Sequence, residues 1–228
     1  MKPILIVVST FNRIDLTGIA LDSIKRNKSA ASDVLIIDDY STEYREEWLN
    51  RWGWPILRSS TPVGVGLAAF RRYQEFVNRG YAYVCVIDND VLVSRDFDVE
   101  MLKLFCAADD GKLTVVSGYH SRTQSTYTAQ PACARSPWDF QEADYWLATT
   151  INGISQFTDH DTAVRVLAAM EGKWEHPWDA NISRVLTRIA VPKRSLIQHL
   201  GIHGFGVNGM SEDIAVDFVG DTFRAKAQ

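Results

Sequence analysis

Acidic residues follow two of the apolar runs in this 228-residue chain. Asp38 and Asp39 come directly after the run 34–37, and Asp88-Asn89-Asp90 comes directly after the run 81–87. Two aspartates separated by one residue can direct carboxylate oxygens at one hard cation, such as Mg²⁺ or Mn²⁺, and that cation can neutralise a diphosphate. A turn is the alternative interpretation of any D-x-D, because Asp and Asn favour turns.

The elements that would position these acids alternate along the first hundred residues. Short apolar runs predict strands, stretches with apolar residues at helical spacing predict helices, and their alternation implies βαβ crossovers in a largely parallel sheet. Ligands of such a sheet collect beyond the carboxyl ends of its strands, where both acidic groups fall. The expected strands are 4–8, 34–37, 55–57 and 81–87, and the expected helices are 16–24, 43–52 and 67–79.

The second half of the chain is less regular. We interpret Asp159 and Asp161 as capping residues of the helix that they begin. We expect one α/β domain over residues 1–228, with a Rossmann-like, mostly parallel central sheet flanked by helices and a more irregular C-terminal half. The elements expected here are a strand at 113–118, a loop or hairpin at 119–139, helices at 159–170 and 179–189, and a strand at 195–200.

Composition limits the classes of function. Lys and Arg number 24 against 28 Asp and Glu, giving a formal net charge of −4, which argues against broad binding to a phosphate backbone. No apolar run approaches the roughly 18 to 20 residues that a membrane span needs, and the N-terminal run is too short for a signal peptide. Three widely spaced cysteines indicate neither a disulfide framework nor a zinc site. We expect a cytoplasmic protein without an integral membrane segment.

Four segments, in order along the chain, carry a resemblance to a known family. They are 6–13 (IVVSTFNR), 34–42 (VLIIDDYST), 64–72 (GVGLAAFRR) and 86–90 (VIDND). Together they resemble the motifs of family 2 glycosyltransferases, which have the GT-A fold. The resemblance implies a nucleotide-diphosphate-sugar donor, with a UDP-type donor favoured, and a divalent metal, Mn²⁺ or Mg²⁺. It also implies a nucleotide-sugar-binding half over residues 1–100 and an acceptor-side half over 101–228.

The resemblance places the nucleoside against the ends of the first two strands. By that resemblance, the segment around Ser9, Thr10 and Phe11 would hold the base and ribose, and Asp39 would bind the nucleobase. Arg13, which closes the first motif, belongs to the same expected donor-binding set.

The resemblance places the diphosphate and metal against the later motifs. Either Arg71 or Arg72 would lie near the nucleotide. Asp88 would face the ribose or sugar and is also a candidate metal ligand, Asn89 is a candidate donor contact, and Asp90 would bind the metal directly.

Two short segments of the second half are candidates for contact with the reacting groups. Asn152-Gly153 could be a small-residue loop that lets the donor sugar approach the backbone, or an ordinary turn. Asp179 resembles the carboxylate that inverting GT-A enzymes place before a helix, where a base removes the acceptor proton, and Glu175 is the second candidate. Asp179 is equally a preferred helix N-cap, and retaining relatives require no such base.

Two histidines near the late strand resemble the C-terminal histidine element of GT-A enzymes. His199 is preferred over His203 as a further metal ligand, and neutral imidazole beside carboxylates suits Mn²⁺. A lone histidine is otherwise a structural residue. The tryptophans of this half, Trp178 among them, could stack on a sugar ring, but core packing is the alternative for most of them.

The sequence therefore favours a metal-dependent, hexosyltransferase-like glycosyltransferase with an unidentified acceptor, and it favours inversion over retention. A glycan, a lipid-linked molecule, a protein or a modified nucleic acid all stay open as acceptors, as does the oligomeric state. Two alternatives remain. One is a nucleotidyltransferase on a related fold, although such enzymes usually carry a basic glycine-rich loop after the first strand, where this chain has Ser9 to Arg13. The other is a catalytically silent nucleotide- or sugar-binding module.

Overall fold

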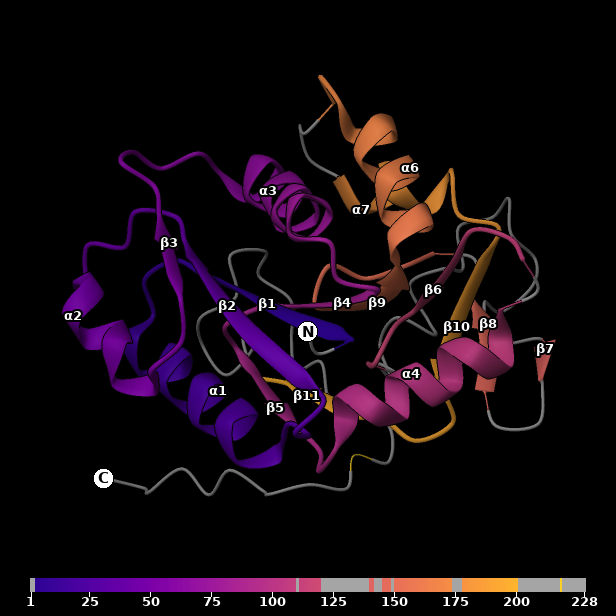
Figure 1. Ribbon diagram of the computed structural model, residues 1–228, viewed down its shortest axis with the longest axis horizontal. Helices are drawn as coiled ribbons and strands as arrows, with labels where there is room; N and C mark the ends of the chain where they lie inside the picture. The colour runs from indigo at the N-terminus through magenta and orange to yellow at the C-terminus, as the bar shows by residue number, and fades with distance from the viewer. Residues whose placement is uncertain are drawn as a thin grey trace.

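A nine-stranded sheet runs through the described part of the chain (Figure 1). The computed structural model describes residues 3–109, 111–119, 140–141, 145–148, 150–173, 178–200 and 218. In spatial order the strands are β3 (Ile56–Arg58), β2 (Ser32–Asp38), β1 (Ile4–Thr10), β4 (Tyr83–Ile87), β9 (Ser155–Asp159), β6 (Thr114–Val116), β10 (Arg188–Pro192), β8 (Tyr145–Ala148) and β7 (Phe140–Gln141).

The strands of the first half are parallel, as the alternation of runs predicts. β1 pairs with β2 and β4, and β2 pairs with β3, all in parallel register. β9 then enters antiparallel between β4 and β6, and β10 pairs parallel with β6 and antiparallel with β8. The predicted strands of the first half and the predicted α/β class are confirmed, and every antiparallel pairing among the described strands involves a strand of the second half.

Helices cover both faces of the sheet. In Figure 1, α1 and α4 lie on one side, and α3, α6 and α7 lie on the other. The bounds are α1 (Ile14–Asn27), α2 (Glu46–Leu49) with the short 3₁₀ helix η1 (Asn50–Trp52), α3 (Val65–Arg79), α4 (Phe97–Ala108), α6 (His160–Met170) and α7 (Trp178–Ser183).

The apolar run of β1 supplies both layers of the core, because successive residues of a strand point to opposite faces. Ile4, Ile6 and Val8 pack in the cluster that includes α1 and α4. Leu5 and Val7 pack in the cluster that includes α3 and α6. All five side chains are buried, so the strand is fixed from both sides and its carboxyl end is held in place.

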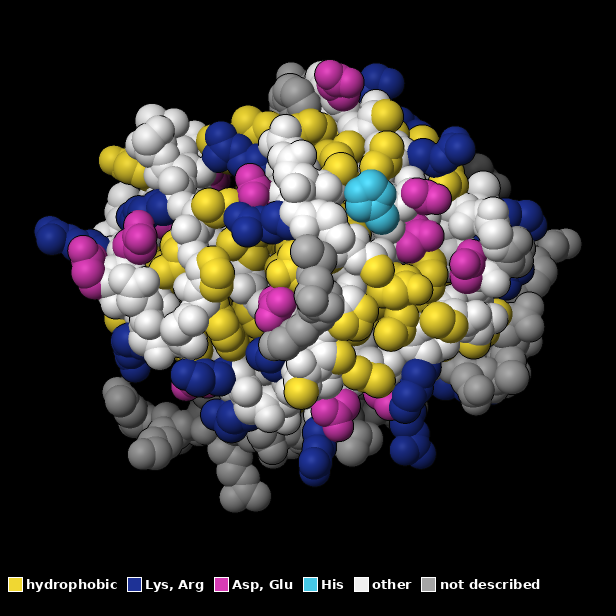
Figure 2. Space-filling view, in the orientation of Figure 1, with side chains coloured by type: hydrophobic (Ala, Val, Ile, Leu, Met, Phe, Trp, Pro, Cys, Tyr) yellow, Lys and Arg dark blue, Asp and Glu magenta, His cyan; other side chains and the backbone are white. Residues whose placement is uncertain are grey.

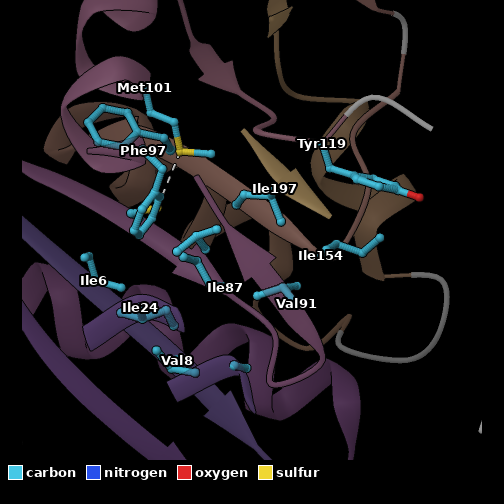
Figure 3. Packing of buried hydrophobic residues seen from close by; sticks show 14 of the residues in the cluster. Ile6, Val8, Ile24, Ile87, Val91, Phe97, Met101, Tyr119, Ile154 and Ile197 are labelled. Atoms are coloured by element: carbon cyan, nitrogen blue, oxygen red, sulfur yellow. Dashed lines mark hydrogen bonds between the residues drawn. The ribbon is translucent and has the colours of Figure 1, made fainter. Parts of the chain in front are cut away.

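A second, two-stranded sheet brings the end of the described chain back to the first half. β11 (Ile197–His199) pairs antiparallel with β5 (Val91–Val93), with His199 opposite Val91. Val91 and Ile197 belong to the same apolar cluster as Ile87, which Figure 3 shows. The strand predicted at 195–200 is therefore confirmed, but it lies outside the main sheet, paired with β5, which begins directly after Asp90.

Some predicted elements of the second half need correction. The helix predicted at 179–189 is wrong after Ser183, because residues 188–192 form β10, in which Ile189 and Val191 are buried in the sheet. α4 was not predicted. Asp159 caps α6 as predicted, since its side chain accepts a hydrogen bond from the amide of Thr162. The loop predicted at 119–139 lies outside the described residues from 120 onward.

Charged side chains are mixed over the surface. Figure 2 shows Lys and Arg interspersed with Asp and Glu on the visible face, rather than gathered into one basic groove. This distribution agrees with the slightly negative net charge of −4. Among the described residues, the helices are all too short or too polar to cross a membrane.

Candidate active site

The carboxyl ends of β1, β2 and β4 meet at one edge of the sheet and border a pocket of about 550 Å³. The pairing register sets this alignment, because Thr10 lies opposite Asp38 and Val8 lies opposite Ile87. Nine of the residues expected to contact donor or metal line this pocket together: Ser9, Thr10, Phe11, Arg13, Asp39, Arg72, Asp88, Asn89 and Asp90.

The turn after β1 has an unusual backbone conformation, which we did not predict from the sequence. Asn12 and Arg13 both have left-handed φ values, 51° and 54°. Such values are uncommon outside glycine, although Asn tolerates them better than most residues. The side chain of Asn12 accepts a hydrogen bond from the amide of Thr42 at 2.7 Å, which ties this turn to the loop after β2. The presence of an Asn two residues after a buried strand could have indicated this left-handed turn. Phe11, half exposed, lies at the pocket.

The two adjacent aspartates after β2 have different tasks. Asp38 is fully buried and accepts a hydrogen bond from Thr10 Oγ1 at 2.9 Å, while Arg58 Nη1 lies 2.9 Å from its other carboxylate oxygen. Asp39 faces the pocket, and its two oxygens accept hydrogen bonds from the backbone amides of residues 63 and 64, at 2.8 and 3.1 Å. Asp38 therefore holds the sheet edge together, whereas Asp39 joins β2 to the loop that precedes α3.

A buried arginine pairs with the first aspartate of the D-x-D. Arg72 is 2% exposed, and its Nη1 donates to Asp88 Oδ1 at 2.7 Å. Burial raises the pKa of Asp88 to about 6, although the charge of Arg72 opposes that rise. Of the two arginines left open by the sequence, Arg72 lines the pocket, whereas Arg71 donates to Ser59 Oγ at 2.6 Å.

Asn89 and Ser9 also lie at the pocket. Asn89 Nδ2 donates to Thr17 Oγ1 of α1 at 2.6 Å, so this side chain anchors the D-x-D turn to the helix. Ser9 Oγ is buried and has no hydrogen-bond partner among the described residues. Ser9 therefore has an uncommitted hydroxyl at the pocket, whereas the amide of Asn89 is already committed to the scaffold.

Asp90, the second aspartate of the D-x-D, is nearly buried between two nitrogen groups. Arg13 Nη1 donates to its Oδ2 at 2.6 Å, and His199 Nε2 lies 3.3 Å from the same oxygen. Burial alone would raise the pKa of Asp90, but the hydrogen bond from His199 and the charges of His199 and Arg13 lower it below its ordinary value. The pairing of β11 with β5 places His199 beside Asp90.

Asp90 also has an oxygen that suits a cation. Its Oδ1 is buried without a hydrogen-bond partner among the described residues, and leaving a buried polar atom unpaired is costly. The described part of the chain holds no group of three or more His, Cys, Asp or Glu side chains arranged to bind a metal alone. Mg²⁺ is commonly held by one or two carboxylates together with substrate phosphates, so Asp90 and His199 fit a metal site that a bound nucleotide completes.

Asn152 and Gly153 lie in the turn before β9, outside the residues that line the pocket. Asn152 is buried, and its Nδ2 donates to Ser117 Oγ at 2.9 Å. Gly153 faces an indole, since a Cβ atom placed on it would lie 2.8 Å from Cζ2 of Trp178. The absence of a side chain at this position therefore has a packing reason.

Asp179 lies in the first turn of α7, as expected from its sequence context. Its Oδ1 accepts a hydrogen bond from the amide of Ala180 at 2.8 Å, which is a contact with its own helix terminus. The preceding residue, Trp178, lies against Arg72, so this end of α7 adjoins the Arg72–Asp88 pair. Glu175 and His203, the other candidates for base and metal ligand, lie outside the described residues.

Comparisons with known proteins agree with this architecture. Among solved structures, a mannosyltransferase from Pyrobaculum calidifontis in complex with GDP-Man and Mn²⁺ is 17% identical over 85% of this chain, with a TM-score of 0.57. GalNAc-T7 with UDP, GalNAc and Mn²⁺ is 10% identical over 86% of the chain, with a TM-score of 0.62. S. aureus TarS 1-349 with UDP-GlcNAc is 13% identical over 86%, with a TM-score of 0.57.

The chain spans 58%, 42% and 58% of the lengths of those three chains. At these identities the likeness shows the fold, which is GT-A. No curated protein matches the chain by sequence. The sequence profile of glycosyl transferase family 2 matches residues 5–158, which is more than half of the chain. The chain belongs to glycosyl transferase family 2.

Proposed function

We propose that this protein is a metal-dependent, hexosyltransferase-like enzyme that moves a sugar from a nucleoside-diphosphate sugar to an acceptor with inversion at the anomeric carbon. One observation carries the proposal. Asp90 presents a buried oxygen, without a hydrogen-bond partner in the described part of the chain, in the same pocket as the Arg72–Asp88 pair. A metal-bound diphosphate needs a carboxylate oxygen that is free to bind the metal and a positive charge near the phosphates. The Asp90 oxygen fits the first need and the guanidinium of Arg72 fits the second. The domain proposed for this activity is 1–228, with the donor on 1–100 and the acceptor on 101–228.

Each residue has a task in that reaction. Ser9, Thr10 and Phe11 hold the base and ribose, and Asp39 faces the nucleobase. Arg72 offers positive charge toward the diphosphate. Asp90 and His199 would hold a divalent metal, whose charge would neutralise the leaving diphosphate, and Asp88 would face the sugar.

The bond changes in the transfer follow from direct displacement. A hydroxyl oxygen of the acceptor forms a bond to the anomeric carbon while the bond from that carbon to the diphosphate oxygen breaks. The electron pair of the broken bond leaves with the diphosphate. Asp179 takes the proton of the hydroxyl as general base. Glu175 is the second candidate for this role.

A UDP-type donor is favoured. The GalNAc-T7 structure holds UDP and the TarS structure holds UDP-GlcNAc, whereas the mannosyltransferase structure holds GDP-Man. The nucleotide is therefore the first property to measure. Nothing in the pocket selects the acceptor.

A thermal-shift panel tests the proposal. UDP, GDP, CDP, dTDP and CMP are each added with Mn²⁺, Mg²⁺ or EDTA. A nucleotide at a hundredfold excess over its Kd stabilises the folded state by about 2.7 kcal/mol, which raises Tm by a few degrees. We expect a shift with one diphosphate that disappears in EDTA, followed by metal-dependent release of that diphosphate from its sugar conjugate. Binding without any turnover would indicate a silent binding module, and no binding at all would contradict the proposed donor site.

A further inference from the structure

Trp178 connects the donor pocket to the helix that carries the candidate base. The guanidinium carbon of Arg72 lies 5.2 Å from the centroid of the Trp178 ring, and both side chains are buried, at 2% and 5% exposure. The same guanidinium donates to Asp88 at 2.7 Å. One buried cation therefore contacts both a carboxylate of the donor pocket and the first residue of α7.

The bonding of Arg72 makes the indole contact important. Arg72 Nε is buried and has no hydrogen-bond partner among the described residues. A buried cation that is incompletely hydrogen-bonded gains from an aromatic face, because the negative face of the ring attracts it and no water competes. The ring of Trp178 thus supports the arginine in the position from which it reaches Asp88.

Contacts from the turn before β9 fix the other end of this link. Any side chain at Gly153 would meet the Trp178 ring, since a Cβ atom there would lie 2.8 Å from Cζ2. The amide of Ile151 donates to Ser183 Oγ at 3.0 Å, so the same turn is also bound to the last residue of α7. The turn therefore contacts both ends of α7, and the ring that contacts Arg72 belongs to the first residue of that helix.

We propose that Trp178 is a positioning residue that couples the donor pocket to α7 and so fixes where Asp179 stands relative to the bound donor. Asp179 is the next residue along the helix, so a shift of the helix start that follows loss of the indole contact also shifts the backbone that carries the Asp179 carboxylate. The inference rests on the proposed glycosyl transfer. Removing the aromatic ring then slows the chemical step much more than it weakens nucleotide binding, which depends mainly on the β1, β2 and β4 edge.

The test compares Trp178→Leu with Trp52→Leu. Trp52 is equally buried and also lies beside an arginine, Arg51, at 5.4 Å, but it belongs to η1 and does not line the pocket. It therefore controls for the general loss of an indole. Three quantities are measured with the nucleoside-diphosphate sugar that gives the largest thermal shift: the Kd of its nucleoside diphosphate, the rate of donor cleavage, and amide hydrogen exchange in residues 178–183.

We expect Trp178→Leu to keep Kd within about threefold, to lower the rate of donor cleavage at least tenfold, and to speed exchange in α7 of the nucleotide complex. Trp178→Phe, which keeps an aromatic face, restores most of the rate, and Trp52→Leu matches the wild type in all three. A wild-type rate in Trp178→Leu, or a loss wholly accounted for by Kd, overturns the coupling.

Two further measurements keep the test decisive. If Trp178→Leu does not fold, Gly153→Ala displaces the indole without removing it and should give the same slower rate at unchanged Kd; an unchanged rate in that variant overturns the coupling. A wild-type protein that binds no nucleoside diphosphate contradicts the proposed function instead, whatever the variants do.

Discussion

The two halves of the molecule hold their polar side chains in different ways. At the edge of β1, β2 and β4, each aspartate is fixed by a named partner: Asp38 by Arg58, Asp39 by backbone amides, Asp88 by Arg72 and Asp90 by Arg13. In the second half, Asp179 contacts the amide of its neighbour, and its helix is held by packing of Trp178. The difference indicates that the proposed donor side is organised by local partners, whereas the helix that carries Asp179 is positioned through a few contacts from other segments.

The largest expected effect comes from Asp90, the proposed metal ligand at the edge of β1, β2 and β4. Asp90→Ala should lower metal-dependent donor cleavage by about 10² to 10³-fold, the usual cost of one preorganised electrostatic group in a transition state. Mn²⁺ binding, followed by electron paramagnetic resonance, should weaken in parallel. Asp161→Ala is the matched control, because the Asp161 side chain is 96% exposed on α6. Full turnover in Asp90→Ala would refute the metal assignment.

Asp179→Asn tests the candidate general base in the second half of the chain. Loss of a general base typically costs about 10² to 10⁴ in rate, and the amide still accepts the hydrogen bond from Ala180. We therefore expect a large fall in kcat for transfer, unchanged thermal stability and an unchanged Kd for the nucleoside diphosphate. A rate near that of the wild type would exclude Asp179 as the base and would leave Glu175 as the remaining candidate.

A pair of buried polar residues gives the most direct contrast between the halves. Asp38→Asn and Asn152→Ala each disrupt a buried hydrogen-bond network, and each should lower the free energy of unfolding by about 1 to 3 kcal/mol. Asp38→Asn should also weaken nucleotide binding several-fold, because Asp38 holds the edge that borders the pocket, whereas Asn152→Ala should leave Kd unchanged. Chemical denaturation and calorimetric titration measure the two quantities. Equal effects on Kd would mean that the halves are not organised separately.

The smallest expected effect concerns a bond between the halves. Tyr73 of α3 donates its hydroxyl hydrogen to Gln156 Oε1 of β9. Tyr73→Phe should cost about 1 kcal/mol at pH 7. Burial raises the pKa of Tyr73 well above 10, its ordinary value. The wild-type contribution is therefore fully present below pH 10 and is lost as pH rises further, because the unfolded chain ionises first.

The control for this prediction is the slope of stability against pH. Between pH 10 and 11, the free energy of unfolding of the wild type should fall more steeply than that of Tyr73→Phe. Parallel slopes would contradict the burial of the phenol. Absorbance at 295 nm follows the ionisation of the tyrosines in the same samples.

The donor side could be predicted from sequence because its signals are local. Val34 to Ile37 is a buried run followed at once by acids, so the strand and the placement of Asp39 both follow from one segment. The D-x-D likewise follows its strand directly and lines the pocket. A parallel sheet then gathers such strand ends without further information.

The second half could be predicted only in part, because its contacts join distant segments. Residues 188–192 have apolar spacing that suits a helix or a strand, and pairing with β6 decides for the strand. Trp178 gave no signal that its partner would be Arg72, about a hundred positions earlier in the chain. The choice between Arg71 and Arg72 likewise depended on how α3 turns toward the pocket.

The small sheet of β5 and β11 has a consequence for the order in which the protein matures. Val93 and Ile197 pair across 104 residues, and contacts of such long separation form late because the intervening chain must first be closed into a loop. A ribosome would have released the edge formed by β1, β2 and β4 well before it synthesised His199. The nascent chain would therefore form this edge first and place His199 beside Asp90 later, so that the proposed metal site would form only after β11 has been synthesised.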